Sequence, residues 1–439
     1  MRRLYSALMY LLTPLALLYL AWRGFREPAY RNGWGERLGL PPADLPRRCI
    51  WVHAASVGEV QAAAGLIRNL QREQPRIPLL ITTMTPTGRE QVLSLFGDSV
   101  RHCFLPLDLP HAVKAFLHRS RPRLALVVEM ELWPNLFHVL RRRGVPLVVA
   151  NARLSERSAR RYAWLPGLMQ PVFEAPARFC AQTADDAHRL RELGASSLGV
   201  VVTGSLKFEQ EIPASARERG EAVRRELGSD RPVWIAASTR EGEDEQILEA
   251  HREILRVVPE SLLLLVPRHP ERFARVHTLC REQGFSVHRR SSDTPCPAEA
   301  QVYLGDSMGE LLVLYGAADV AFIGGTLVPI GGHNPLEAAA LGLPVLMGPH
   351  VFKMQLVADQ LVECGAGQLV NDAALLADAV AELLEQPDRR AAAGRRALDL
   401  MNANRGATER MLEEIRPLLE ESARRPAHGA QDGPPGKEM

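Results

Sequence analysis

The stretch that decides the fold is GGHNPLEAAALGLPVLMGPH, residues 331–350. It predicts a glycine turn, a short helix and a buried strand: Asn334 suits the helix cap, Pro335 the first helical position, and Gly342 the end of the helix. A helix N-terminus preceded by two glycines also suits an anionic group such as a phosphate. Any αβ unit needs the same cap and stop, so both interpretations stay open on this stretch alone.

Working outward, short apolar runs alternate with helical patterns along both halves of the chain. The runs are 50–54, 79–82, 123–128, 146–150, 179–182 and 200–202, then 233–236, 262–266, 285–287, 302–304, 320–323 and 345–347. Such alternation is typical of βαβ units with a parallel sheet. Because 439 residues exceed what one core usually supports, we predict an α/β protein with two Rossmann-like domains in tandem.

The expected domains follow from changes in this alternation. We place a membrane anchor over 1–22, an N-terminal domain over 23–205, a C-terminal domain with terminal helices over 206–422, and a disordered tail over 423–439. Mixed composition over 204–214 marks the linker. Ligands in such sheets bind beyond the carboxyl ends of the strands, so we expect the two sheets to face one cleft.

The first segment, 5–22, is apolar, carries no charge and is close to the minimum length of a bilayer span. More arginines follow it than precede it, which favours a cytoplasmic position for the folded body. Pro14 interrupts the run, so a helix that lies in the membrane interface stays an alternative to a single span.

Composition narrows the class of protein. Hydrophobic residues make up 46% of the chain and charged residues 24%, as in ordinary globular enzymes. A formal charge of +2 excludes the strongly basic character of a typical nucleic-acid-binding protein. The 6 cysteines are scattered singly, so we expect no structural metal and a reducing compartment.

Carboxylates follow strands of the first predicted domain. Glu59 lies in HAASVGEV, where it also forms a capping box with Ser56. Glu129 lies in VVEMELWPN directly after a buried strand, although Glu131 could simply be an acidic first-turn residue. Lys207 in GSLKFE comes after the last strand, where a solvated linker lysine is the alternative.

Cationic side chains follow strands of the second domain instead. Arg240 in ASTREGEDE comes next to hydroxyl groups that include Ser238, and the acids after it are typical of the first turn of a helix. Arg268 and His269 lie between two prolines in PRHPERF, where they suit a phosphate or form an exposed turn. A carboxylate in one domain and an anion pocket in the other suit a general base acting with an activated donor.

The order of these motifs is itself informative. HAASVGEV, EMELWPN, TGSLKFE, STREGEDE, PRHPERF, GDSMGEL and GGHNPLEAAALGLPVLMGPH closely resemble the 3-deoxy-D-manno-octulosonic acid (Kdo) transferases of lipopolysaccharide assembly. The resemblance implies the GT-B architecture and transfer of Kdo from CMP-Kdo to a lipid A precursor, lipid IVA, with inversion at the anomeric carbon. It also implies no cofactor, no metal, no nucleic-acid partner, and a place on the cytoplasmic side of the inner membrane.

The resemblance assigns roles by motif. Glu59 becomes the base that takes the acceptor proton, and Glu129 and Lys207 support the transition state. By motif, the donor-binding residues are Arg268, His269, Met308, Gly309, Glu310, Asn334, Pro335, Leu336 and Glu337. The residues after the strands of the second domain add Ser238, Arg240 and Gly332. Two alternatives are a nucleotide-sugar epimerase on the same architecture and a non-catalytic, membrane-tethered nucleotide-sugar binder.

Overall fold

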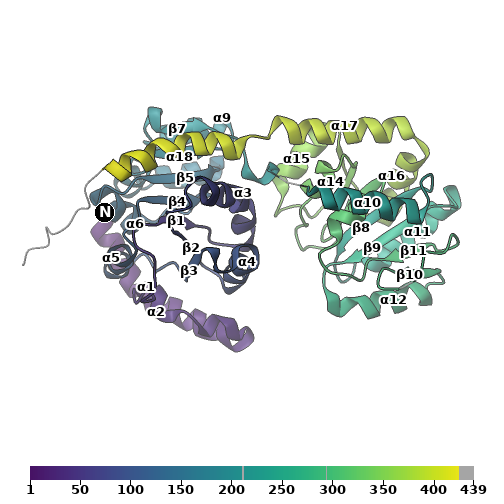
Figure 1. The fold of residues 1–439 in the computed structure, drawn as a ribbon, viewed down its shortest axis with the longest axis horizontal. Coiled ribbons are helices and arrows are strands. Elements are labelled where there is room, and N and C mark those ends of the chain that lie inside the picture. The colour runs from purple at the N-terminus through teal and green to yellow at the C-terminus, as the bar shows by residue number, and fades with distance from the viewer. Residues whose placement is uncertain (210–211, 293, 425–439) are drawn as a thin grey trace, which may run out of the picture. The chain divides into compact units, whose positions relative to one another are not determined.

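The structure, a computed structural model, describes residues 1–209, 212–292 and 294–424. It divides the chain into two compact units (Figure 1). The first holds Met1–Glu209 and the chain from Arg405 onward, and the second holds Gln210–Asn404. The chain thus leaves the first unit inside the segment expected to be the linker.

The first unit is built on a parallel sheet of seven strands in the order β3-β2-β1-β4-β5-β6-β7. The strands are β1 (Ile50–His53), β2 (Leu79–Thr83), β3 (Arg101–Phe104), β4 (Leu124–Val128), β5 (Leu147–Ala152), β6 (Arg178–Ala181) and β7 (Val200–Val202). Its central strands are buried on both faces, which is why they are continuous apolar runs in the sequence.

Helices cover both faces of this sheet. One face packs against α5 (Pro110–Ser120), α6 (Pro134–Arg142), α8 (Pro166–Phe173) and α9 (Ala184–Glu192). The other packs against α3 (Val57–Glu73), α4 (Pro86–Phe96) and α18 (Ala407–Arg424). The remaining helical elements are η1 (Pro28–Arg31), α2 (Trp34–Arg37), η2 (Gly97–Ser99), α7 (Glu156–Ala163), η3 (Ser197–Gly199) and η4 (Leu206–Phe208).

The second unit repeats the plan with a parallel sheet ordered β10-β11-β9-β8-β12-β13-β14. Its strands are β8 (Val233–Thr239), β9 (Leu262–Pro267), β10 (Val287–Arg289), β11 (Val302–Leu304), β12 (Val320–Ile323), β13 (Val345–Met347) and β14 (Gly367–Leu369). Its helices are α10 (Ala214–Leu227), α11 (Asp244–Val257), η5 (Pro270–Arg272), α12 (Phe273–Glu282), α13 (Leu311–Tyr315), α14 (Leu336–Ala340), α15 (Gln355–Glu363), α16 (Ala373–Glu385) and α17 (Pro387–Ala403).

Both sheets reverse their winding direction at one point, between β1 and β4 in the first unit and between β8 and β12 in the second. Connections diverge there to opposite sides, which leaves a crevice at the carboxyl ends of the two strands. The prediction of two Rossmann-like domains is therefore confirmed, and each sheet offers one such place for a ligand.

Two edge strands were absent from the prediction. β3 begins with Arg101 and His102, and β14 consists of a glycine, a glutamine and one exposed leucine. Edge strands need little apolar character because only one neighbour and a partial face bury them. Hydrophobic pattern alone therefore missed both.

The terminal helix α18 differs from the domain assignment, which placed it in the second unit. It packs Met411 and Ile415 on the sheet of the first unit. The Nε of Arg178 also donates to a Glu414 oxygen at 2.6 Å. Pro417 lies inside α18, and the helix continues past it. Its apolar stripe specifies burial but not which sheet buries it. From 425 onward the expected tail lies outside the described residues.

The N-terminal helix α1 runs unbroken over Arg2–Arg26, so Pro14 does not interrupt it. Among the described residues it is the one helix long and apolar enough to cross a membrane, and very little of it is buried. Its first half is attached to the first unit, since Ser6 Oγ donates to Asn135 Oδ1 at 2.9 Å and the Tyr10 hydroxyl lies 2.8 Å from His111 Nδ1. Figure 1 shows α1 along the periphery of that unit.

Candidate active site

Glu59 lies in the first turn of α3, directly beyond the carboxyl end of β1. Ser56 Oγ accepts a hydrogen bond from the Glu59 N–H and donates to Glu59 Oε1 at 3.0 Å, so Ser56 is the predicted N-cap, although the reciprocal backbone bond of a capping box comes from Ala55 and not from Ser56. The Ala55 N–H donates to Glu59 Oε2 at 2.7 Å. Both carboxylate oxygens are therefore held in place, and the side chain remains partly exposed.

The environment of Glu59 changes its acidity. Burial raises the pKa of the Glu59 carboxyl to about 7, and the nearby charges of Glu129 and Glu131 add to this effect against the Ala55 hydrogen bond. A carboxylate with a pKa near the working pH can accept a proton and still be ionised before the reaction. The capping role and a role as base are thus compatible in one side chain.

Glu129 follows β4 at the other side of the winding reversal. Its backbone has a φ of 62°, a left-handed conformation that a non-glycine residue adopts at a cost. Its carboxylate pairs with Lys207 Nζ at 3.1 Å. The predicted residues Glu59, Glu129 and Lys207 are therefore brought together, and Glu131, whose pKa is raised by burial, joins them.

In the second unit, Arg240 and His269 meet at the carboxyl ends of β8 and β9. An Arg240 guanidinium nitrogen contacts His269 Nε2. Burial and the Arg240 charge lower the pKa of His269, which favours its neutral form. Ser238, just before, is buried and has a φ of 60°. Ser238 thus marks an irregularity near the end of β8, where the register with β9 shifts, and Arg240 follows the strand beside the β9 end.

The turn before α14 completes this cluster. The helix begins at Leu336, one residue later than predicted, and Asn334 Oδ1 accepts from the Leu336 N–H at 3.1 Å. Burial raises the pKa of Glu337, which is hydrogen-bonded to the Asn334 side chain and lies within the field of Arg268. Gly332 has a φ of 83°, and a Cβ there would lie 2.8 Å from Met354.

His333 and Lys353 are members of the cluster that the motifs did not identify. Burial lowers the pKa of His333 to about 4, with contributions from the charges of Arg268, Arg240 and Lys353. His333 stands in GGHNP, so its place inside that motif was the available signal. Lys353 follows the stretch 331–350 by three residues, and no local pattern marks it.

Glu243 corrects part of the expected acidic first turn, because it is the N-cap residue of α11 and only Asp244 and Glu245 lie in the first turn. It is fully buried, and its carboxylate accepts from the N–H groups of Arg240, Gly325, Thr326 and Leu327 at 2.6–2.9 Å. Asp244 is also buried, with Thr239 and Arg272 as partners. These acids hold the loops after β8 and β12 and do not face solvent.

The segment 308–310 has a different set of contacts. Glu310 accepts from Ser307 at 2.6 Å and pairs with Arg290 at 3.1 Å and with Arg219. Met308 is exposed, and Gly309 has a φ of 77°. The segment follows β11, two strands away from β8, and its contacts run toward β10 and α10.

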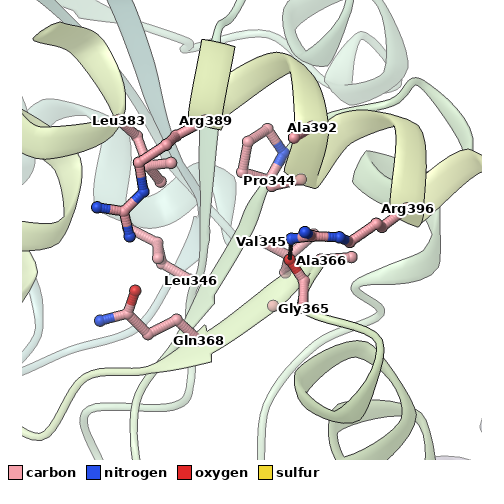
Figure 2. Close-up of a pocket in the computed structure, with 12 residues that line it drawn as sticks. Pro344, Val345, Leu346, Gly365, Ala366, Gln368, Leu383, Arg389, Ala392 and Arg396 are labelled. Atoms are coloured by element: carbon pink, nitrogen blue, oxygen red, sulfur yellow. Dashed lines mark hydrogen bonds between the residues drawn. The ribbon is translucent and has the colours of Figure 1, made fainter. Parts of the chain in front are cut away.

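A hollow of about 340 Å³ lies elsewhere in the second unit, between α17 and the amino ends of β13 and β14 (Figure 2). Arg389 pairs with Glu382, and Arg396 donates to the Gly365 carbonyl at 3.4 Å. This is the edge of the sheet opposite to Arg240. The hollow is therefore separate from the strand-end cluster.

Within the described residues, no group of three or more His, Cys, Asp or Glu could hold a metal ion.

Comparisons with known proteins agree with this geometry. Residues 32–210 match the family model for 3-deoxy-D-manno-octulosonic-acid transferases. The chain is 42% identical to the 3-deoxy-D-manno-octulosonic acid transferase of Haemophilus influenzae, over 95% of this chain and 99% of the relative. It is 37% identical to the transferase of the same name from Bordetella pertussis, again over 95% and 99%.

The fold by itself is shared more widely. A solved structure of UDP-GlcNAc 2-epimerase from Neisseria meningitidis, bound to UDP-GlcNAc, superposes with a TM-score of 0.51 at 16% identity, over 84% of this chain and 99% of that one. Epimerase and transferase therefore have the same GT-B-like architecture, and sequence identity over nearly the whole length decides between them. The chain belongs to the Kdo transferase family and is a glycosyltransferase.

Proposed function

We propose that this protein transfers Kdo from CMP-Kdo to a hydroxyl group of a lipid A precursor, lipid IVA, with Glu59 as the general base. The observation that carries the proposal is the Glu59 carboxyl, with a pKa of about 7 beside Glu129 and Glu131. It lies where the first sheet reverses its winding, the expected place for a ligand.

A sugar hydroxyl is a weak nucleophile at neutral pH, so its proton must leave as it attacks. The Ala55 N–H and Ser56 Oγ hold the Glu59 carboxylate in one orientation for this transfer. Lys207 balances the charge of Glu129, which keeps a second carboxylate beside the base at a smaller electrostatic cost. With one base and direct displacement of CMP, the anomeric centre inverts.

The second unit supplies the donor half of the proposal. Arg240 and Arg268 suit the phosphate of CMP, since guanidinium groups stabilise the negative charge that develops on the leaving group. Neutral His269 can accept or donate a hydrogen bond there. Glu337, with Asn334 beside it, suits the ribose hydroxyls. The other members are Ser238, the segment 308–310, Gly332, Pro335 and Leu336. The proposed reaction uses no metal and no cofactor.

The decisive experiment is incubation of the purified full chain with CMP-Kdo and lipid IVA, followed by mass spectrometry. A transferase yields a lipid heavier by one or more Kdo residues and one CMP for each. An epimerase would leave the lipid unchanged and alter the sugar of the donor. A non-catalytic binder would bind the donor and release no CMP.

We further propose that α1 lies in the membrane interface and does not span the bilayer. The contacts of Ser6 with Asn135 and of Tyr10 with His111 attach its first half to the catalytic unit, and a span would have to break them. The catalytic units would then rest on the cytoplasmic face of the inner membrane. Deleting residues 1–22, or changing exposed Leu8, Leu11 and Leu15 to serine, should strongly weaken the binding of the protein to vesicles. Sedimentation with unchanged vesicle binding would refute this attachment.

A further inference from the structure

The corner between α7 and α8 presents large apolar side chains to solvent. Trp164 is 81% exposed and Leu165 is 47% exposed, and they follow one another at the end of α7. A buried position would be usual for side chains of this size. We call Arg157, Arg160, Arg161, Trp164 and Leu165 the α7–α8 corner.

The charged residues of the α7–α8 corner are mostly of one sign. Arg157, Arg160 and Arg161 are exposed on the two turns that precede Trp164. The acid of this helix, Glu156, pairs with Arg160. The corner therefore keeps a net positive charge beside exposed tryptophan and leucine. This combination fits the interface of an anionic bilayer, where tryptophan sits at the headgroup level and arginine binds lipid phosphates.

The position of the corner continues the apolar surface of α1. The side chain of Met1 lies against Gly167, whose Cβ, if added, would be 3.0 Å from Met1 Cγ. Met1, Leu4 and Leu8 are themselves exposed. A bilayer that receives the exposed face of α1 therefore meets the start of α8 at the amino end of that helix.

The corner also shares a core cluster with the carboxylate segment, because Tyr162 of α7 and the neighbours of Glu131 in sequence, Met130 and Leu132, pack against the same buried side chains. Tyr162, on the inner side of α7, packs on Phe173 with ring centroids 5.8 Å apart. Burial raises the pKa of Tyr162, and the charge of Glu131 adds to this shift. Glu131 in turn acts on Glu59. One short helix therefore has the exposed arginines on one side and a residue of the catalytic neighbourhood on the other.

We propose that the α7–α8 corner is a second membrane contact, which inserts Trp164 and Leu165 among the headgroups of anionic lipid and holds the Glu59 site at the bilayer surface. The proposal rests on the proposed function, because a lipid acceptor must reach Glu59 from that surface. It assigns the corner to the lipid surface and not to a protein partner, since its charge and its continuity with α1 match a membrane.

Depth-dependent fluorescence quenching tests the contact without any turnover. Full-length protein is mixed with vesicles of phosphatidylethanolamine and brominated phosphatidylglycerol, and tryptophan emission is compared between wild type and Trp164→Ser. Trp51 and Trp234 are fully buried and serve as an internal unquenched background, and the other tryptophans, Trp22, Trp34 and Trp133, contribute equally to both proteins. Loss of a quenched component in the variant supports the contact. Equal quenching in both proteins overturns it.

Kinetics test its purpose. Arg157→Gln and Arg161→Gln combined should raise the apparent KM for acceptor in anionic vesicles by at least about threefold and leave turnover of detergent-dispersed acceptor unchanged. The matched control is Arg225→Gln with Arg281→Gln, two exposed arginines of the second unit. An unchanged KM in vesicles overturns the proposal. Absence of transfer by the wild-type protein would instead refute the proposed function and leave the quenching result standing.

Discussion

The two units have the same sheet plan and opposite chemistry at the same place. Each has seven parallel strands and one winding reversal, with functional candidates beyond the carboxyl ends. In the first unit those candidates are Glu59, Glu129 and Glu131, balanced by Lys207. In the second, Arg240, Arg268 and His269 supply positive or neutral basic groups, with Glu337 as a buried acid among them. The architecture therefore determines where a ligand meets the sheet, and the side chains after each strand determine which ligand it is.

Carboxylates in the two units also differ in the hydrogen-bond donors that they receive. Glu59 receives one backbone N–H and one hydroxyl, and its pKa is raised, so it can exchange a proton. Glu243 receives four backbone N–H groups and is fully buried. Four donors suit a fixed anion that organises loops. The difference separates the carboxylate proposed to react from a structural one, and five experiments can break or sharpen it.

The largest effect is expected from Glu59→Gln. Glutamine keeps the size and part of the capping geometry but cannot take a proton, so kcat should fall by about 10²–10⁴-fold. The measurement is the rate of CMP release at saturating donor and acceptor. Glu90→Gln, on the exposed side of α4, is the control. A folded Glu59→Gln protein with normal turnover would show that Glu59 is only a cap.

Next comes Glu243→Ala in the second unit. The change leaves four backbone N–H groups without their charged acceptor, so the free energy of unfolding of this unit should fall by about 3 kcal/mol or more. Urea unfolding followed by tryptophan fluorescence measures it, because Trp234 is the tryptophan of the second unit and the remaining emission comes from the first. Exposed Glu241, which pairs with Arg275, provides the control as Glu241→Ala. Equal stabilities of the two variants would contradict the structural role.

The donor half is tested by Arg268→Gln and Arg240→Gln. Each removes a charge-assisted contact worth about 1.5–3 kcal/mol, so the KM for CMP-Kdo should rise by about 10–100-fold. Initial rates at varied donor concentration give this value, with Arg275→Gln as a surface control. A rise confined to the acceptor KM would mean that these arginines do not bind the donor.

The pH dependence follows from the raised pKa of Glu59. The base must be ionised, so kcat/KM should fall about tenfold per pH unit below a pH of about 7. Removing a neighbouring negative charge with Glu131→Gln should lower the pKa of Glu59, so the fall in kcat/KM should begin at a lower pH. If kcat/KM of the wild-type protein fell only below the ordinary pKa of a glutamate, the assignment of Glu59 as the base would be contradicted.

The smallest effect is expected for the ion pair in the first unit. Lys207 and Glu129 have side chains that are 40% and 31% exposed, so solvent screens much of their attraction. Lys207→Met should change the free energy of unfolding by less than about 1 kcal/mol. Activity should respond more than stability, because Lys207 balances a charge beside the base. Thermal unfolding alongside kcat measures both, and a large loss of stability would indicate a mainly structural lysine.

Much of this arrangement can be predicted from the sequence, because it depends on local pattern. Buried parallel strands are continuous apolar runs, and the residues after them, Glu59, Glu129, Arg240 and Arg268 among others, follow from position alone. Weak patterns limit such prediction. Edge strands β3 and β14 have little apolar character, and α18 has an apolar stripe that fits either sheet.

What the sequence by itself determined is therefore the fold class, the motif order and the strand-end residues, since each is encoded within a few consecutive positions. Only the tertiary structure decided that Glu243 is buried under four N–H groups, that α18 returns to the first unit, and that Glu59 has a pKa of about 7. These properties depend on groups distant in sequence, because burial and electrostatic fields are set by neighbours in space. The pKa of Glu59 is one of these properties, because its charged neighbours Glu129 and Glu131 follow a different strand, β4.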